Sequence, residues 1–288
     1  MQMKVLRTTF LLTALTLVLL TIGGAVGGRN GMTIALMFAV FSNAIAYFFS
    51  DKIALMSSGA KPVSREELPR LYDVMERLAA KANLPVPKLY MIPEAAPNAF
   101  ATGRNPSHAS VAVTQGLMQL MNDEELEGVI AHELSHVRNY DILISSIAAT
   151  IAGAITHLAY MGRFAAIFGY GSSRDNDRGG GLTALLMLFL APFAALLLQL
   201  GISRQREYSA DETGAKMVGQ PYGLISALQK LGAYNQRIPS NIPQSTSALC
   251  IVKPMFGGGS IFSSLFSTHP PLEERIAALR QLTISRPG

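Results

Sequence analysis

The residues VIAHELSHVRNYDILISSIAATIAGAITHLAYMG, from Val129 to Gly162, decide the fold of this 288-residue chain. They begin with a HExxH motif, from His132 to His136, and run on into an apolar stretch without a break in the pattern. In an α-helix, positions i and i+4 lie on one face, so both imidazoles can reach a single ion. The stretch therefore predicts a metal-binding helix that continues directly into a membrane span.

Four apolar segments have roughly the length that a helix needs to cross a bilayer. They cover about residues 8–26, 32–49, 142–161 and 182–202. The first segment could instead be a cleaved signal peptide, but its apolar core is long for a signal and a second segment follows directly. The third could be a buried core helix, although its length without a charge favours a span. We therefore expect four transmembrane helices.

These segments divide the chain into an N-terminal transmembrane hairpin (1–50), a polar region (51–141), a second transmembrane pair (142–202) and a second polar region (203–288). Charged residues make up only 15% of the chain, whereas soluble domains average about 25%. The sequence therefore predicts one protease domain assembled from the two polar regions and carried by the four spans.

The distribution of basic residues predicts the orientation in the membrane. Of the 24 Lys and Arg residues, the connections within the two helix pairs hold only Arg29, Arg163, Arg174 and Arg178. The positive-inside rule then places both polar regions and both termini in the cytoplasm. The single cysteine, Cys250, excludes an intrachain disulfide and suits a reducing compartment. A cytoplasmic face against anionic lipid accounts for the basic pI, and no basic and aromatic pattern suggests nucleic-acid binding.

The first polar region has the pattern of an α+β fold that is mainly helical. Residues 64–84 have helical apolar spacing, and Ser64 with Glu67 forms a capping box at their start. Asn122 is expected to cap the HExxH helix, with Glu125 at the capping-box position. Three short β-rich runs predict strands: PKLYMI from Pro87, NAFATG from Asn98 and ASVAVT from Ala109.

The HExxH motif predicts a catalytic zinc site with one ion per chain. Imidazole ligands suit Zn²⁺, and a site with three protein ligands leaves a position for water. Zinc lowers the pKa of that water towards neutrality. Glu133, next to the first histidine, is then the expected general base.

The third ligand must come from later in the chain, because Asn139 and Ile142 replace the glycine and histidine of HExxHxxGxxH. Glu207 follows the fourth segment by about as many residues as His136 precedes the third, so helical continuation puts both at similar height above one membrane face. Asp211, one turn later, is placed to accept the other N–H of a ligating histidine. The candidates are His157, Glu207, Asp211, Glu212 and His269; His157 lies too far along the helix, and Glu212 faces elsewhere.

Three motifs, AHELSH (131–136), SRQREYSAD (203–211) and STHPPLEERI (267–276), resemble the HtpX-type membrane zinc metalloproteases, relatives of the CAAX prenyl endopeptidases. The resemblance covers nearly the whole chain and implies a gluzincin-like domain. It implies that His132, His136 and Glu207 bind zinc and that Asp211 supports them.

The same resemblance implies roles for residues that local pattern alone leaves undistinguished. His269 and Arg275 would border the site and stabilise the tetrahedral intermediate. On pattern alone, His269 is a loop histidine and Arg275 a solvated helix residue. Asn98 and Ala99 would belong to an edge strand to which a substrate peptide adds.

The resemblance also implies the biological setting. Four spans cannot enclose the chamber of the prenyl proteases, which argues against CAAX processing. The expected function is a membrane-embedded endopeptidase of the bacterial inner membrane that cleaves membrane proteins, in quality control of misfolded or damaged proteins under stress. The alternatives are a dedicated processing protease with one substrate and a non-enzymatic metal-binding membrane scaffold. Glu133 argues against the scaffold, because a structural zinc site needs no base.

Overall fold

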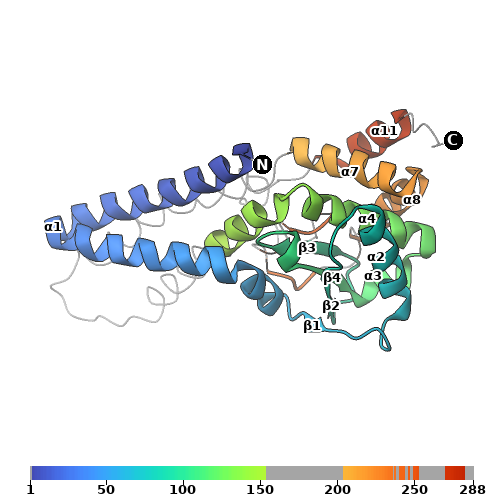
Figure 1. The fold of residues 1–288 in the computed structure, drawn as a ribbon, viewed down its shortest axis with the longest axis horizontal. Helices are drawn as coiled ribbons and strands as arrows, with labels where there is room; N and C mark the ends of the chain where they lie inside the picture. The colour runs from blue at the N-terminus through green and yellow to red at the C-terminus, as the bar shows by residue number, and fades with distance from the viewer. Residues whose placement is uncertain are drawn as a thin grey trace.

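The computed structural model describes residues 2–153, 204–235, 237, 240–243, 246, 249–252 and 270–282. A long helical hairpin projects from one side of a body that combines a small sheet with packed helices (Figure 1). The mainly helical α+β class agrees with the sequence prediction. The apolar segment 182–202 and the end of 142–161 lie outside the described residues.

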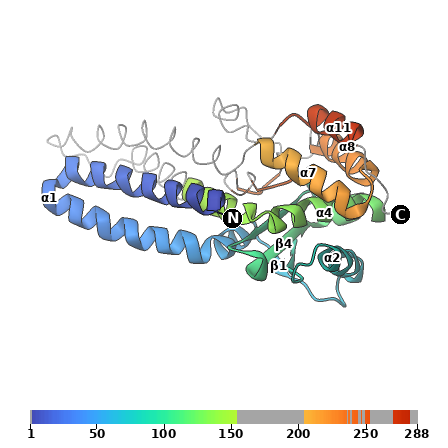
Figure 2. The same cartoon turned by 45° about the horizontal axis from the view of Figure 1, so that its top comes forward.

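The hairpin is formed by α1, Gln2–Ser57, which breaks at Gly27 and Gly28. Gly28 has a φ of +59°, a left-handed conformation that glycine adopts without strain. Its two arms run back side by side in both views (Figures 1 and 2). Asn43 Nδ2 donates to Thr16 Oγ1 across the arms at 2.9 Å. The expected N-terminal helical hairpin is therefore present.

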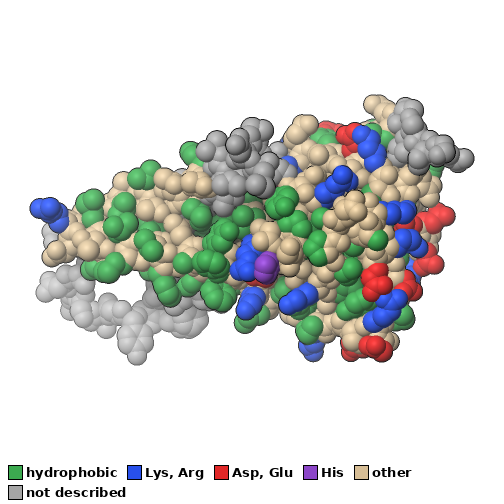
Figure 3. All heavy atoms as spheres, in the orientation of Figure 1, with side chains coloured by type: hydrophobic (Ala, Val, Ile, Leu, Met, Phe, Trp, Pro, Cys, Tyr) green, Lys and Arg blue, Asp and Glu red, His purple; other side chains and the backbone are tan. Residues whose placement is uncertain are grey.

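Among the described residues, one helix is long and apolar enough to cross a membrane, the second arm Gly27–Ser57. Its large apolar side chains face outward: Ile34 is 64% exposed and Phe41 is 65% exposed. Figure 3 shows the hairpin surface as mainly apolar, whereas charged side chains gather on the body. The helix Asp141–Gly153 is apolar but shorter, and it opens the third predicted segment. Four complete spans stay a prediction.

A four-stranded sheet has the order β1-β2-β4-β3. The strands are β1 Lys61–Pro62, β2 Lys88–Ile92, β3 Ala99–Gly103 and β4 Ala109–Thr114. β4 pairs in parallel with β2 and antiparallel with β3, which leaves β3 at one edge. The three predicted strands are confirmed, with starts shifted by one residue in β2 and β3.

Helix α2, Pro69–Lys81, begins five residues later than the sequence analysis placed it. One of the two hydrogen bonds of the predicted capping box is present: Ser64 N–H donates to Glu67 Oε2 at 2.6 Å. It stabilises a turn that precedes α2 and does not cap the helix itself. Pro69 explains the shift, since proline disfavours a helical conformation in Leu68 and suits the first helical position. The predicted apolar face is buried, through Leu71, Val74, Met75 and Leu78.

Helix α4, Asp123–Arg138, is the centre of the body. Its predicted capping box is confirmed, with Asn122 and Glu125 exchanging both hydrogen bonds. Two short elements precede it in the chain, the 3₁₀ turn η1 (Pro106–His108) and the helix α3 (Gln115–Leu120). Helix α4 packs on the strand β3 and on two later helices, α7 (Arg204–Val218) and α8 (Tyr222–Asn235). Helix α11, Leu272–Gln281, covers α7 and α8, and Figure 2 shows these helices stacked over α4 and the sheet.

The HExxH helix does not run unbroken into the apolar segment, contrary to the sequence prediction. It ends at Arg138, and Tyr140 then takes a left-handed φ of +57° before the helix Asp141–Gly153 begins. The break has a local consequence: it brings Asp141 Oδ2 within 3.4 Å of His136 Nδ1. An unbroken helix would place residue 141 more than one turn beyond His136 and on a different face.

Candidate metal centre

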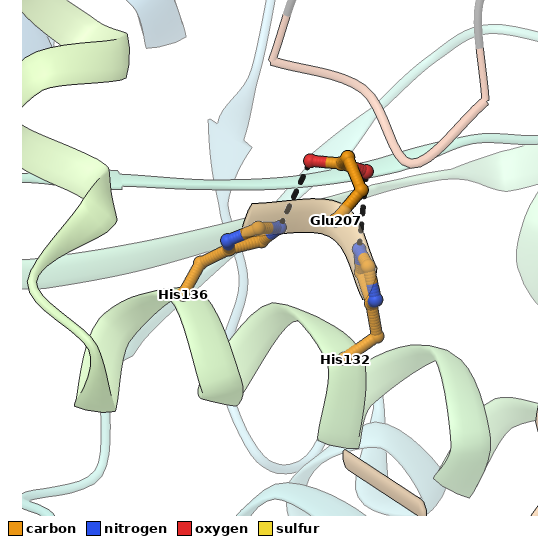
Figure 4. Close-up of side chains that lie close together, drawn as sticks. All are labelled: His132, His136 and Glu207. Carbon is orange, nitrogen blue, oxygen red and sulfur yellow. Dashed lines mark ion pairs between the residues drawn. The ribbon is translucent and has the colours of Figure 1, made fainter. Parts of the chain in front are cut away.

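Three side chains from two helices converge on one point. His132 and His136 extend from α4 and Glu207 extends from α7 (Figure 4). His132 Nε2 lies 3.8 Å from Glu207 Oε2, and His136 Nε2 lies 3.5 Å from Glu207 Oε1. The side chains are largely buried: His132 is 1% exposed, His136 is 16% exposed and Glu207 is 6% exposed. The structure therefore brings together the three residues that the sequence analysis selected as ligands.

The donor set fits a divalent ion. One ligand atom from each of the three residues lies within 4.8 Å of the others. Two atoms that each lie about 2 Å from a shared zinc ion stand at most about 4 Å apart, which accommodates both histidine–glutamate distances. His132 Nε2 is buried without a hydrogen-bond partner among the described residues. A buried nitrogen in that state needs a partner, and a metal ion supplies one.

The close approach of α7 to α4 has a local cause in Gly214. A Cβ at this position would lie 3.0 Å from the His132 backbone nitrogen and 3.1 Å from the Ala131 carbonyl carbon. These distances are tighter than most Cβ contacts, so glycine favours this close approach of the two helix backbones. This approach holds Glu207 opposite the two histidines.

Carboxylates stand behind both histidines. Asp211 Oδ1 lies 2.8 Å from His132 Nδ1, and Asp141 Oδ2 lies 3.4 Å from His136 Nδ1. With each Nδ1 facing a carboxylate, each Nε2 is left to face the centre, the arrangement that orients ligating histidines in metal sites. The predicted role of Asp211 agrees with this geometry. The sequence pattern did not identify Asp141 as a partner of His136. An acidic residue five positions after His136 was the available signal, but it points to the histidine only if the helix breaks between them.

Arg275 is fully buried, although its local pattern suggested a solvated position. Its guanidinium donates two hydrogen bonds to Asp211, from Nε to Oδ2 at 2.8 Å and from Nη2 to Oδ1 at 2.7 Å. Nη1 donates to the Ile251 carbonyl at 2.7 Å and lies 3.7 Å from Glu207 Oε2. Arg275 thus borders the site, as the resemblance implied, but its donors hold Asp211 and Ile251.

Glu133 is buried beside the ligands, and neither of its carboxylate oxygens has a hydrogen-bond partner among the described residues. Its pKa is raised to about 7, mainly by burial; the charge of Glu207 also raises it, while His136, the Ala101 backbone and Arg275 lower it. A carboxylate with a pKa near neutrality can take up and release a proton at working pH. This is the property that a general base requires.

The histidine pair is electrostatically unequal. Burial lowers the pKa of His132, although the hydrogen bond that His132 donates to Asp211 raises it. Burial also lowers the pKa of His136. The hydrogen bond that His136 donates to Asp141 and the negative charges of Glu207 and Glu133 outweigh burial, so the pKa of His136 is raised. The Asp211 pKa is lowered, because Arg275 more than offsets the effect of burial. Metal binding requires the ligating nitrogen of each histidine to be unprotonated.

Residues 64–283 match the family model described as Peptidase family M48. This range includes all three motif regions and covers well over half of the chain. The chain belongs to peptidase family M48. The M48 assignment makes it a metallopeptidase, and the buried group of two histidines and one glutamate is its candidate metal centre.

Relatives of this M48 chain match it over nearly its full length, each named "Protease HtpX homolog". The protein of Desulfatibacillum aliphaticivorans is 53% identical and covers 98% of this chain and 90% of its own length. Those of Syntrophobacter fumaroxidans and Thermodesulfovibrio yellowstonii are 52% and 50% identical, covering 96% and 97% of this chain and 98% and 99% of their own. The crystal structure of S. mikatae Ste24p aligns with a TM-score of 0.49 and 20% identity, over 96% of this chain and 65% of that one.

The remaining predicted residues of the M48 site have different outcomes. His269 and His157 lie outside the described residues. Ala99 begins the edge strand β3 and Asn98 directly precedes it, and both are buried. Their outer side is occupied by the chain itself: Ile251 N–H donates to the Ala99 carbonyl at 3.0 Å, and Asn98 Nδ2 donates to the Val252 carbonyl at 2.8 Å.

Proposed function

We propose that the chain is a zinc endopeptidase of the bacterial inner membrane that cleaves misfolded or damaged membrane proteins. The observation that carries this proposal is the convergence of His132, His136 and Glu207 beside the buried Glu133, whose carboxylate oxygens have no hydrogen-bond partner among the described residues. One Zn²⁺ per chain, when bound, would polarise the scissile carbonyl and lower the pKa of a water molecule. Zinc is proposed because two imidazoles and one carboxylate with an open position form its usual catalytic donor set.

Glu133 would act as the general base. It would take a proton from the attacking water and pass it to the leaving amine, which its pKa of about 7 permits in both directions. Asp211 would hold His132 in one tautomer, and Arg275 would hold Asp211. His269 would stabilise the oxyanion together with Arg275, a role that rests on the family resemblance alone.

The substrate would bind as an added strand at β3. Thr114 N–H donates to the Asn98 carbonyl, so the backbone polar groups of Asn98 point toward β4. Because these groups alternate along a strand, those of Ala99 and Ala101 point toward the free edge. Backbone pairing at such an edge accepts many sequences, which suits a protease with broad targets. Segment 251–252 would have to move away from Ala99 before a peptide could pair there.

Placement of the domain supports membrane proteins as substrates. The sheet follows an apolar hairpin within a few residues, so exposed loops and tails of neighbouring membrane proteins would reach the site. The proposed organisation is the one set out from the sequence: a hairpin, a second transmembrane pair and a cytoplasmic domain made from both polar regions.

Glu133→Gln tests the function directly. The variant should keep zinc, measured by metal analysis of the purified protein, and lose casein cleavage, because Glu133 is assigned as base and not as ligand. Loss of zinc together with activity would contradict that assignment. Peptide products from membranes that hold wild type or Glu133→Gln then separate the alternatives: many cleaved proteins support quality control, and one supports a dedicated processing protease. Zinc binding without any cleavage by the wild type would support a scaffold.

Cysteine labelling tests the topology. With Cys250 replaced, single cysteines at Asn30 and Ser173 should react with an impermeant thiol reagent from outside. Cysteines at Ser107 and Ser245 should react only after the membrane is opened. Outside labelling at Ser107 would invert the orientation and exclude cytoplasmic quality control.

A further inference from the structure

A pocket lies away from the metal centre, where the end of α1 meets the sheet. Its volume is about 640 Å³, and none of the three candidate metal ligands lines it. Phe48, Phe49 and Leu55 of α1 form part of its wall, and β2 and β4 form the other side. Leu55 packs with Phe100 and Ala112 of the sheet, so this junction joins the hairpin firmly to the body.

Basic side chains surround this pocket without acidic partners. Lys52, Lys88 and Arg104 line it, against one acidic residue, Asp51. Within the described part of the chain, none of the three forms an ion pair, whereas Arg65, Arg70, Arg77, Lys216, Lys230 and Arg275 all do. Figure 3 shows basic and histidine side chains gathered where the apolar hairpin joins the body. With three basic side chains against one carboxylate, the pocket presents net positive charge to an anionic ligand.

The length of the apolar run before the pocket is consistent with a position at the height of lipid headgroups. A helix crosses the hydrocarbon core with about 20 residues, and within the candidate span Gly27–Ser57 the uncharged apolar run extends from Met32 to Phe49. Lys52 follows less than one turn later, about 4.5 Å along the axis. The headgroup layer on each side of the core is roughly 5–8 Å thick. Lys52 therefore lies within that layer when Phe49 lies at its inner boundary.

Aromatic side chains mark the same boundary. Phe48 and Phe49 are 52% and 47% exposed, and Lys52 Nζ lies 5.4 Å from the centre of the Phe49 ring. Val86, also at the pocket, is 47% exposed. The apolar side chains Phe48, Phe49 and Val86 and the basic side chains Lys52, Lys88 and Arg104 line the same pocket. A phospholipid likewise presents apolar acyl chains next to a negatively charged phosphate.

We propose that this pocket binds the headgroup of an anionic phospholipid. The phosphate would lie among Lys52, Lys88 and Arg104, because guanidinium and ammonium groups bind phosphate oxygens by charge-assisted hydrogen bonds. The glycerol and the first acyl carbons would lie against Phe48, Phe49 and Val86. A lipid held there would touch α1, β2 and β4 together and set the height of the catalytic body above the membrane.

Lipid titration of the full-length protein in detergent tests the proposal, with bound lipid counted by native mass spectrometry. The probes are short-chain phosphatidylglycerol, phosphatidylcholine with the same acyl chains, and inorganic phosphate. Wild type should bind phosphatidylglycerol more tightly than either of the other two. K52Q/K88Q/R104Q should bind it about 100-fold more weakly, since each basic side chain near an anionic lipid contributes about 5-fold.

A matched variant controls for net charge. K81Q/R237Q/R280Q removes the same charge outside the pocket and should change the affinity by less than about 2-fold, because distant exposed charges are screened. Equal losses in both triple variants would overturn the proposal in favour of diffuse attraction. Phosphatidylcholine binding as tightly as phosphatidylglycerol would also overturn it, and inorganic phosphate binding as tightly would assign the pocket to a soluble anion. If the triple pocket variant does not fold, K88Q alone decides, with an expected loss of about 5-fold.

Discussion

Asp211 Oδ1 lies 2.8 Å from His132 Nδ1, on the side of the imidazole that faces away from Glu207. The contact fixes which nitrogen of His132 carries a proton and leaves Nε2 for the metal. Because both side chains are buried, water cannot replace this hydrogen bond. The arrangement leads to the first prediction.

Asp211→Ala should weaken zinc binding by about 10- to 100-fold, the usual effect of removing a carboxylate behind a ligating histidine. Competition with a chelator of known affinity measures the change. Arg275 loses its closest carboxylate in the same variant, so R275M/D211A removes both charges and shows how much of the effect comes from the buried guanidinium left without Asp211. Zinc affinity equal to that of wild type in Asp211→Ala would contradict the orienting role.

Glu207→Ala should remove zinc binding far more severely than Asp211→Ala does, because it deletes a ligand rather than its support. Glu212→Ala on the same helix is the control: Glu212 is exposed and pairs with Lys216. Zinc content after dialysis separates the two. Full zinc retention in Glu207→Ala would move the third ligand elsewhere in the chain.

Gly214→Ala should destabilise the protein and weaken zinc binding. Alanine in a helix is intrinsically favoured over glycine by about 1 kcal/mol, so close packing on His132 and Ala131 must reverse that sign. A clash of this kind costs about 1–3 kcal/mol and displaces α7, which carries Glu207. Thermal unfolding and zinc titration of the full-length protein measure both effects. A gain in stability with unchanged zinc affinity would show that the helices are not in close contact there.

The Glu125 network should make stability depend on pH. Burial raises the pKa of Glu125, but hydrogen bonds from Lys230, Ser226 and the Asn122 backbone lower it more, so the folded-state pKa lies below the ordinary value of 4.5. A carboxylate with a depressed pKa stabilises the fold above its unfolded-state pKa and loses this contribution as the pH falls through the folded-state value.

Glu125→Gln should therefore lower the free energy of unfolding by about 1–3 kcal/mol at neutral pH, the range for hydrogen bonds to charged groups. The difference from wild type should shrink as the pH falls below about 4.5. Denaturant unfolding at several pH values measures it, with Glu212→Gln as the control for an exposed ion pair. A difference that stays constant down to acid pH would exclude ionised Glu125 as its source.

Much of this protein follows from short-range sequence pattern. The apolar runs and glycines predict the N-terminal hairpin, the β-rich runs predict three strands, and Asn122 with Glu125 predicts the start of the HExxH helix. The i, i+4 spacing alone places His132 and His136 on one face. These features depend on backbone preferences and on neighbours within one or two turns, which the order of residues determines directly.

Only the tertiary structure decided the contacts between distant segments. Packing of α7 on α4 through Gly214 brings Glu207 to the histidines, and the turn at Tyr140 brings Asp141 behind His136. Arg275 shows the limit most clearly, because its helix pattern suggests solvent while the folded chain buries it against Asp211 and Ile251. A charge can be buried only where distant segments supply its partners, so neither local charge nor spacing could have predicted it.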